Sequence, residues 1–404
     1  MTASVFRDKA AIVGVGYSRG QTPVFNRNSG VSVLTLAVRA AVDACNDAGL
    51  DPKDLDGGLT YSVLNDSVGP DAVLPALGAR NITWSTFISG GGENSSFSAV
   101  LAAEAVVHGV CNYVLVYRAL NSRSGVRVGG QGRPPVGVGE PLTGARKWDT
   151  VYGFGGAAAI FGLGARRYMA KYGVSSEDFG RFAVNSRSHA LNNPRAAMRS
   201  PIALEDHQNS RWICEPYHLL DCCQESDVGV AFVVTTAERA KHLRRPPVLI
   251  SSGMTCRTRL DDEADTRGGL LAPYLLRSAG IELKDIDFVQ PYDNFTDNPM
   301  RVMEDFGFCP KGEFKDFQLG GRLDFDGDLP ILTQGGLMNE GYAHGLNNLT
   351  EAAMQLMGDS EDNCPRWQDG VHTYDRKICR QLKDPQIGLH LSVSGYGGVV
   401  LKRG

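Results

Sequence analysis

The sequence predicts an α/β protein made of two duplicated halves, in which strands alternate with helices. The first observation is an internal repeat: residues 48–56 read AGLDPKDLD, and residues 279–287 read AGIELKDID. A tyrosine follows each copy at the same spacing, Tyr61 in the first and Tyr292 in the second. In both copies the pattern indicates a helix that ends at a glycine, then an acidic turn, then a strand. The second observation is length, because 404 residues suit two domains or two halves of one unit.

The boundary between the halves is predicted at the connector 244–247, RRPP, which separates the two copies. This gives an N-terminal half over residues 1–245 and a C-terminal half over residues 246–404. Residues at about 119–155 are rich in glycine, proline and arginine and lack periodicity, which predicts a long loop over a site or at a subunit contact. Its arginines either meet phosphates or stay solvated. They are Arg123, Arg127, Arg133 and Arg146.

Periodicity places the main elements. Helices are predicted at about residues 33–48, 157–171 and 349–357. Apolar runs predict strands at residues 10–16, 113–117, 228–234 and 248–251, and residues 388–401 read as a strand–glycine–strand hairpin. The first strand ends in Gly14 and Gly16 but lacks the GxGxxG spacing, so a dinucleotide site is not favoured.

Composition excludes several classes of protein. A net charge of -4 without a basic run argues against nucleic acid as a partner. No apolar run reaches membrane-spanning length, and residues 1–9 lack the apolar core of a signal peptide. The nine scattered cysteines suit reduced thiols in a cytoplasmic protein. Because there is no CxxC and no HxxxH, we expect neither a metal nor another cofactor.

Two polar stretches are the candidate site. Residues 335–345, GGLMNEGYAHG, place a phenol, an imidazole, an amide and a carboxylate between glycines, ahead of a helix. Residues 290–296, QPYDNFT, again offer a tyrosine, an acid and an amide after an apolar strand. A Gly-rich stretch alone can be a plain surface turn, so the hypothesis depends on whether the two stretches meet.

A strand, a glycine turn and a helix start are predicted at residues 87–98, FISGGGENSSFS. Enzymes often expose a nucleophile at such a turn. Here Ser95, Ser96 and Ser98 suit helix capping better, because no histidine with obvious pairing lies nearby in the sequence. In the terminal hairpin, Ser394 and Gly395 are predicted to present backbone N–H groups that can stabilise an oxyanion.

Taken together, these stretches resemble the thiolase superfamily, and especially its sterol-carrier-protein type, the lipid-transfer proteins. The resemblance covers essentially the whole chain and includes residues 189–194, HALNNP, and 220–229, LDCCQESDVG. It implies a thiolase-like fold of two duplicated α/β halves, with mixed five-stranded sheets and helices in layers.

The departures from thiolases are informative. The family's nucleophilic cysteine falls around residues 92–94 and its second cysteine in residues 392–398, and neither segment contains a cysteine. Tyr342 corresponds to the histidine of the family's Gly-His-Pro sequence. Tyr292 and Asn294 correspond to the histidine and the cysteine of its His-Asp-Cys-Phe sequence. Claisen chemistry needs a thiolate and a base, so thiolase activity is not expected.

In having tyrosines at both positions, the chain resembles the aldolase branch of the family. The members of this branch are similar to bacterial enzymes that shorten steroid side chains. The resemblance implies cleavage of a β-hydroxy acyl-CoA without covalent catalysis, with Tyr292 and Tyr342 sharing the proton transfers. The two phenols can share these transfers if their surroundings lower a phenol pKa that is normally about 10. Which tyrosine is base and which is acid stays open.

Four neighbours are candidates for supporting roles. We expect His344 or Asp293 to tune the tyrosines, and Asn294 or the N–H of Gly395 to hold an oxyanion.

The resemblance also implies a substrate and partners. The substrate is expected to be a 17-hydroxy steroid C22-type CoA thioester, cleaved to a ring ketone and propionyl-CoA. A homodimer is expected, joined in a heterotetramer by an OB-fold protein of the DUF35 type, and any zinc would belong to that partner. Two alternatives are a non-catalytic acyl-CoA- or lipid-binding subunit and an acetyl-CoA acyltransferase that uses a displaced cysteine, Cys222 or Cys223.

Overall fold

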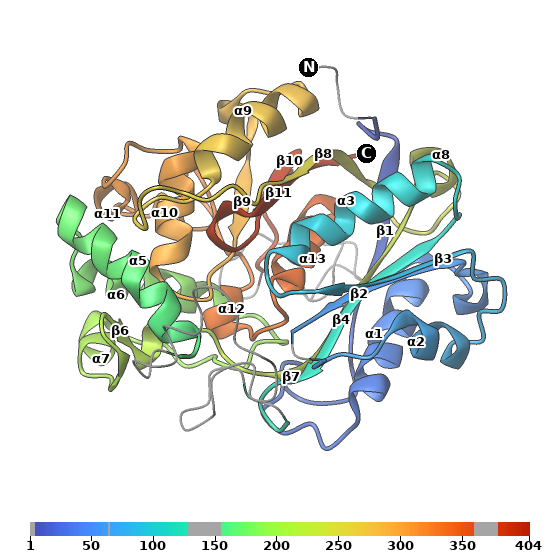
Figure 1. The fold of residues 1–404 in the computed structure, drawn as a ribbon, viewed down its shortest axis with the longest axis horizontal. Coiled ribbons are helices and arrows are strands. Elements are labelled where there is room, and N and C mark those ends of the chain that lie inside the picture. The colour runs from blue at the N-terminus through green and yellow to red at the C-terminus, as the bar shows by residue number, and fades with distance from the viewer. Residues whose placement is uncertain (1–4, 64, 126, 128–154, 359–378) are drawn as a thin grey trace.

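A nine-stranded sheet runs through the computed structural model, which describes residues 5–63, 65–125, 127, 155–358 and 379–404 (Figure 1). Its order is β3-β2-β4-β7-β1-β8-β11-β10-β9. The strands are β1 Ala10–Tyr17, β2 Gly57–Ser62, β3 Trp84–Ser89, β4 Val114–Asn121, β7 Asp227–Thr236, β8 Val248–Thr255, β9 Phe288–Pro291, β10 Ile387–Leu391 and β11 Gly397–Arg403. A separate pair is β5 Trp212–Cys214 and β6 Tyr217–His218.

Helices cover both faces of the sheet (Figure 1). They are α1 Val33–Ala48, α2 Pro70–Ala76, α3 Asn94–Val107, α5 Ala157–Tyr172, α6 Ser176–Ala190, α7 Leu204–Gln208, α8 Ala237–Ala240, α9 Gly268–Ala279, α10 Asp297–Phe306, α11 Phe314–Phe317, α12 Gly336–Asn339 and α13 Leu346–Met357. On one face α3 and α13 contact each other and strands of both halves. On the other face α1 and α2 pack against the first strands, and α9 and α10 against the last ones. The predicted helices at 33–48 and 157–171 and the predicted strands are confirmed.

The sheet differs from the predicted pair of five-stranded sheets. Five strands come from residues 10–236 and four from residues 248–403, and the two sets join where Ala11 and Ile12 of β1 pair with β8. Joining removes two exposed sheet edges, which would otherwise present unpaired backbone groups. The second set has four strands where five were predicted. Beside β9, where a fifth strand could pair, the described residues form only a single parallel bridge between Val289 and Ile331. The predicted boundary after residue 245 lies in the connection between α8 and β8.

The internal repeat has the same structure in both copies, as predicted. Helix α1 ends at Gly49 (φ 72°) and helix α9 ends at Gly280 (φ 67°), both in the left-handed conformation that glycine adopts readily. A short 3₁₀ turn and then β2 or β9 follow. The repeat therefore brings Tyr61 and Tyr292 to equivalent ends of two strands.

The predicted loop at 119–155 is described only in part. Strand β4 extends to Asn121, and Arg127 pairs with Glu225, with Nε 2.6 Å from the carboxylate oxygen. Residues 126 and 128–154, which include Arg133 and Arg146, lie outside the described residues. Within the described part of the chain, no helix is both long and apolar enough to cross a membrane.

Candidate active site

The two polar stretches meet, as predicted. The hydroxyl oxygens of Tyr292 and Tyr342 are 2.7 Å apart and hydrogen-bonded. Tyr292 follows β9, and Tyr342 lies in the loop between α12 and α13. The rings are edge to face, with centroids 6.4 Å apart. Tyr292 is buried and Tyr342 is half-buried.

Two glycines make room for Tyr292. A Cβ atom on Gly92 would collide with the hydroxyl end of the tyrosine ring, and one on Gly345 would lie 2.6 Å from the ring. Gly345 also has a φ of 81°. Gly345 immediately precedes α13 and Gly92 lies two residues before α3, so the starts of both central helices enclose the phenol. Leu337, Val393 and the half-buried Phe161, Cys223 and Tyr396 complete an apolar surround.

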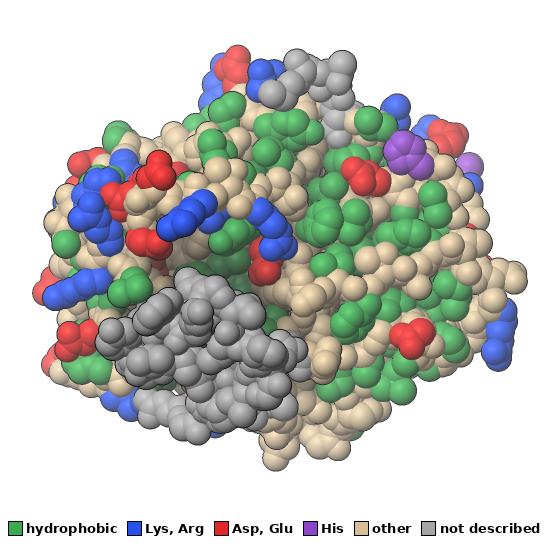
Figure 2. Space-filling view, in the orientation of Figure 1, with side chains coloured by type: hydrophobic (Ala, Val, Ile, Leu, Met, Phe, Trp, Pro, Cys, Tyr) green, Lys and Arg blue, Asp and Glu red, His purple; other side chains and the backbone are tan. Residues whose placement is uncertain are grey.

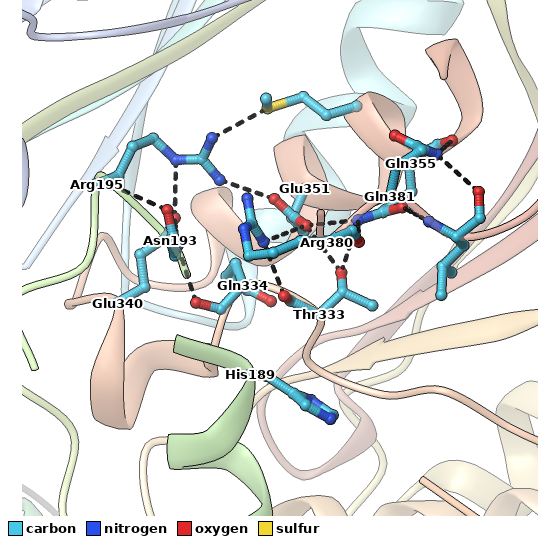
Figure 3. Close-up of polar contacts among 12 residues, drawn as sticks. His189, Asn193, Arg195, Thr333, Gln334, Glu340, Glu351, Gln355, Arg380 and Gln381 are labelled. Carbon is cyan, nitrogen blue, oxygen red and sulfur yellow. Dashed lines mark hydrogen bonds and ion pairs between the residues drawn. The ribbon is translucent and has the colours of Figure 1, made fainter. Parts of the chain in front are cut away.

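A buried network holds the loop that carries Tyr342 (Figure 3). Glu340 accepts hydrogen bonds from Arg195 Nε at 2.9 Å, from Asn193 at 3.0 Å and from Asn347 at 2.9 Å. Arg195 also pairs with Glu351 of α13 at 2.8 Å. Buried charges are stable only when they are paired in this way, so the network ties the loop firmly to α13.

The electrostatics differ from the prediction of a lowered phenol pKa. Burial raises the pKa of Tyr292 well above 10, and the neighbouring phenol acts in the same direction. Burial also raises the pKa of Tyr342, although its hydrogen bond to Tyr292 and the nearby Arg118 oppose the shift. Both side chains are therefore neutral phenols at neutral pH, because desolvation disfavours a phenolate.

Asp293 faces away from the tyrosine hydroxyls. Its carboxylate accepts hydrogen bonds from the N–H groups of Leu337 at 2.9 Å and Met338 at 3.2 Å, and from the side chain of Asn348 at 3.2 Å. Burial raises its pKa to about 7. Asp293 holds the first turn of α12 against β9, and its predicted tuning of the tyrosines stays a prediction.

The two predicted oxyanion donors differ in availability. The Gly395 N–H donates to the carbonyl oxygen of Ser392 at 3.0 Å, so the hairpin turn already uses it, and the predicted role is not supported. Asn294 Oδ1 accepts a hydrogen bond from Asn298 at 2.9 Å. Asn294 Nδ2 has no partner among the described residues and stays a candidate donor.

His344 is held by residues that the sequence analysis did not single out. Arg118 Nη2 lies 3.1 Å from His344 Nδ1 and 2.6 Å from Asp66, and all three side chains are buried. The His344 and Tyr342 ring centroids are 4.4 Å apart. The sequence signal was available: Arg118 is a lone charge inside the apolar strand VLVYRALN, and a buried charge needs a partner.

The capping prediction for the serines of α3 is wrong. The helix has no side-chain cap, and Ser95 Oγ lies 2.8 Å from the Gly92 carbonyl oxygen and 2.9 Å from His390 Nε2. His390 Nδ1 donates to the Gln290 carbonyl oxygen at 2.9 Å. Burial lowers the His390 pKa to about 4. The pairing histidine was missed because it is 295 residues away in the chain.

No described cysteine is suited to be a nucleophile at this site. Burial raises the pKa of both Cys222 and Cys223 well above the usual thiol value, so neither supplies a thiolate near neutral pH. This disfavours a thiolase that uses a displaced cysteine. Within the described residues, no three His, Cys, Asp or Glu side chains gather as a metal site would require.

Comparisons with known proteins agree with this picture. Residues 272–371 match the model of the thiolase C-terminal domain-like family. The chain is 41% identical over 369 residues to a steroid side-chain-cleaving aldolase of Thermomonospora curvata, which covers 88% of this chain and 92% of the relative. It is 40% identical over 364 residues to a 17-hydroxy-3-oxo-4-pregnene-20-carboxyl-CoA lyase of Mycobacterium tuberculosis, covering 87% and 92%.

A solved structure is similar over the whole length. The Ltp2-ChsH2(DUF35) aldolase superposes with a TM-score of 0.85 at 36% identity and covers 99% of both chains. The predicted thiolase-like fold and the predicted likeness to steroid side-chain-cleaving aldolases are thus confirmed.

Proposed function

Because this chain belongs to the family of thiolase-fold steroid side-chain-cleaving aldolases, we propose that it is a carbon–carbon lyase acting on a 17-hydroxy steroid C22-type CoA thioester. The products are a ring ketone and propionyl-CoA. The observation that carries the proposal is the 2.7 Å hydrogen bond between Tyr292 and Tyr342, at a site where the described cysteines nearby, Cys222 and Cys223, are held as neutral thiols by burial.

The chemistry is a retro-aldol cleavage. The β-hydroxyl group loses its proton, and its oxygen forms the ketone as the bond between the β- and α-carbons breaks. The bonding electrons pass to the thioester as an enolate. Protonation of the α-carbon then gives propionyl-CoA. Atoms balance without a co-reactant, because one proton leaves oxygen and one proton reaches carbon.

Neutral phenols suit this balance. One tyrosine accepts the proton of the substrate hydroxyl while its own proton moves along the shared hydrogen bond to the other tyrosine. That second tyrosine donates its own proton to the α-carbon. No phenolate has to exist before the substrate binds, so pKa values raised by burial are compatible with the reaction. We propose that the reaction needs no metal or other cofactor, and that any zinc belongs to a partner.

We further propose a partner of the DUF35 OB-fold type, a homodimer and a cytoplasmic location. The structurally similar aldolase, named with ChsH2(DUF35), supports the partner. The homodimer is supported by β3, an edge strand of the sheet that carries the 45% exposed Phe87. Figure 2 shows apolar side chains gathered with few charges over α3, as a protein interface requires. Together these interfaces would give a heterotetramer.

The test uses the chain co-expressed with a DUF35-type partner. We would incubate the complex with the 17-hydroxy C22 steroid CoA thioester and follow products by mass spectrometry. A ring ketone and propionyl-CoA in equal amounts support the proposal. Bound but intact substrate would overturn it and favour a non-catalytic acyl-CoA-binding subunit, and acyl transfer to free CoA would favour an acyltransferase.

A further inference from the structure

We propose that His344 is a catalytic residue that donates a hydrogen bond from Nε2–H to the thioester oxygen as the enolate forms, with Arg118 and Asp66 as positioning residues that fix its tautomer. The inference rests on the proposed lyase function and adds the group that stabilises its intermediate.

The tautomer of His344 follows from its partner. A guanidinium group donates hydrogen bonds and cannot accept them, so the 3.1 Å contact from Arg118 Nη2 makes His344 Nδ1 an acceptor without a proton. The proton of the neutral ring is therefore on Nε2. Burial and the nearby Arg118 lower the pKa of His344 well below 6.5, so the ring stays neutral. Asp66 pairs with Arg118 at 2.6 Å and holds the guanidinium in place.

The backbone of His344 is also held in the left-handed conformation, which few non-glycine residues adopt. Its φ is 51°, and the hydroxyl of the buried Tyr61 donates to its carbonyl oxygen at 2.9 Å. Non-glycine residues in this region are strained and persist only where neighbours fix them, often at functional sites. Contacts from Tyr61 and Arg118 thus fix both the backbone and the ring of one buried histidine.

The free edge of the ring lies beside the glycine turn at residues 90–92. Nε2 has no hydrogen-bond partner among the described residues. The adjacent ring carbon, Cδ2, would lie 3.2 Å from a Cβ atom on Gly91, and Gly92, the next residue, faces the hydroxyl of Tyr292. The ring also packs against Tyr342. Nε2–H therefore lies near the glycine turn that borders Tyr292 and on a ring that packs against Tyr342, and we infer that the thioester oxygen binds there.

The experiment compares two amide substitutions that separate a positioned donor from a structural role. Glutamine in His344→Gln places an amide nitrogen at about the distance of Nε2, whereas asparagine in His344→Asn reaches only the Nδ1 position. Asparagine tolerates positive φ better than glutamine, so backbone strain alone would make His344→Gln the more damaged variant, the opposite of the order expected here. We expect His344→Asn to lower kcat about 10²–10³-fold with KM little changed, and His344→Gln to recover part of the loss.

The matched control is His189→Gln. His189, labelled in Figure 3, is also buried; its Nδ1 donates to the carbonyl oxygen of Ile331 and its ring packs against Phe325 rather than against either tyrosine. We expect this variant to keep wild-type kcat. If His344→Asn also kept it, the inference would be overturned while the lyase function stood. Absence of cleavage by the wild-type complex would overturn the lyase function itself, and this inference with it.

A second readout does not depend on turnover. In ¹⁵N-histidine-labelled protein, NMR should show the His344 ring protonated at Nε2, with the signal assigned by its loss in His344→Gln. The Arg118 guanidinium can only donate a hydrogen bond, whereas the amide of Arg118→Gln can also accept one. This substitution should therefore raise the fraction of His344 rings protonated at Nδ1 and lower kcat. A wild-type ring protonated at Nδ1 would overturn the inference.

Discussion

The hydroxyl end of Tyr292 occupies the space that a side chain on Gly92 would need. The family's nucleophilic cysteine falls at this turn, around residues 92–94. At position 92 a cysteine and the buried phenol exclude each other by volume. The glycine and the tyrosine therefore form one unit, in which the phenol proposed to transfer a proton lies beside the start of α3.

The first prediction concerns this fit. Gly92→Ala should displace the Tyr292 hydroxyl, lower kcat by up to about 10²-fold through misplacement, and lower the free energy of unfolding by about 1–3 kcal/mol through overpacking. Steady-state kinetics and urea unfolding measure both effects. Gly162→Ala is the control, because a Cβ atom there meets nothing closer than 3.5 Å. Wild-type kcat in Gly92→Ala would contradict the tight fit.

The second prediction concerns the phenol pair. Tyr292→Phe and Tyr342→Phe should each lower kcat about 10²–10⁴-fold, because each removes one end of the proton relay. The double variant should be no slower than the slower single variant, since residues that act as a unit are not additive. Rates follow from propionyl-CoA release.

Tyr168→Phe is the control for the loss of a buried hydroxyl group. Tyr168 donates to Glu304 at 2.5 Å, outside the candidate site, so its loss should lower the free energy of unfolding without slowing cleavage. Two single Tyr→Phe variants with wild-type rates would exclude the relay.

Local patterns were sufficient for the elements and the repeat. Helix α1 begins and ends where apolar spacing and Gly49 indicate, because capping and periodicity are properties of short segments. The joined sheet was not predictable, because the β1–β8 pairing involves only two residues on each strand. Sequence patterns specify which residues are buried, and not which strand edge another strand will cover.

The sequence was sufficient to predict those residues of the candidate site whose type and position in a motif are informative by themselves. Tyr292 and Tyr342 stand out by their positions, but the pKa direction was wrong because burial on all sides is a property of the packed structure. Arg118 and His390 reach the site from strands distant in the chain. Their partners could be identified only once the sheet had placed them.

The third prediction concerns the buried network in Figure 3. Glu340→Ala should lower the free energy of unfolding by about 3–5 kcal/mol, because it leaves Arg195 with one fewer carboxylate in a buried place. It should also lower kcat, since the Tyr342 loop loses its anchor. Urea unfolding measures stability. Glu238→Ala, which breaks a fully exposed pair with Lys241, is the control and should leave the unfolding midpoint unchanged.

The last prediction concerns pH, where two buried groups act in opposite directions. The His390 pKa is lowered from 6.5 to about 4, so the unfolded chain binds more protons between these values. This contribution to the free energy of unfolding is present above pH 6.5 and is lost as pH falls toward 4. The Asp293 pKa is raised from 3.8 to about 7, so the folded chain binds more protons there. Its contribution is present below pH 3.8 and is lost as pH rises through 7.

Urea unfolding from pH 4.5 to 8 separates the two groups. His390→Gln should remove part of the loss of stability on the acid side, because glutamine does not titrate and its amide reaches the Nε2 position beside Ser95. Asp293→Asn should remove part of the decrease in the free energy of unfolding that occurs as pH rises toward 7. The difference between variant and wild type must therefore slope in opposite directions for the two substitutions. Slopes of the same sign would show that at least one group does not titrate as its burial requires.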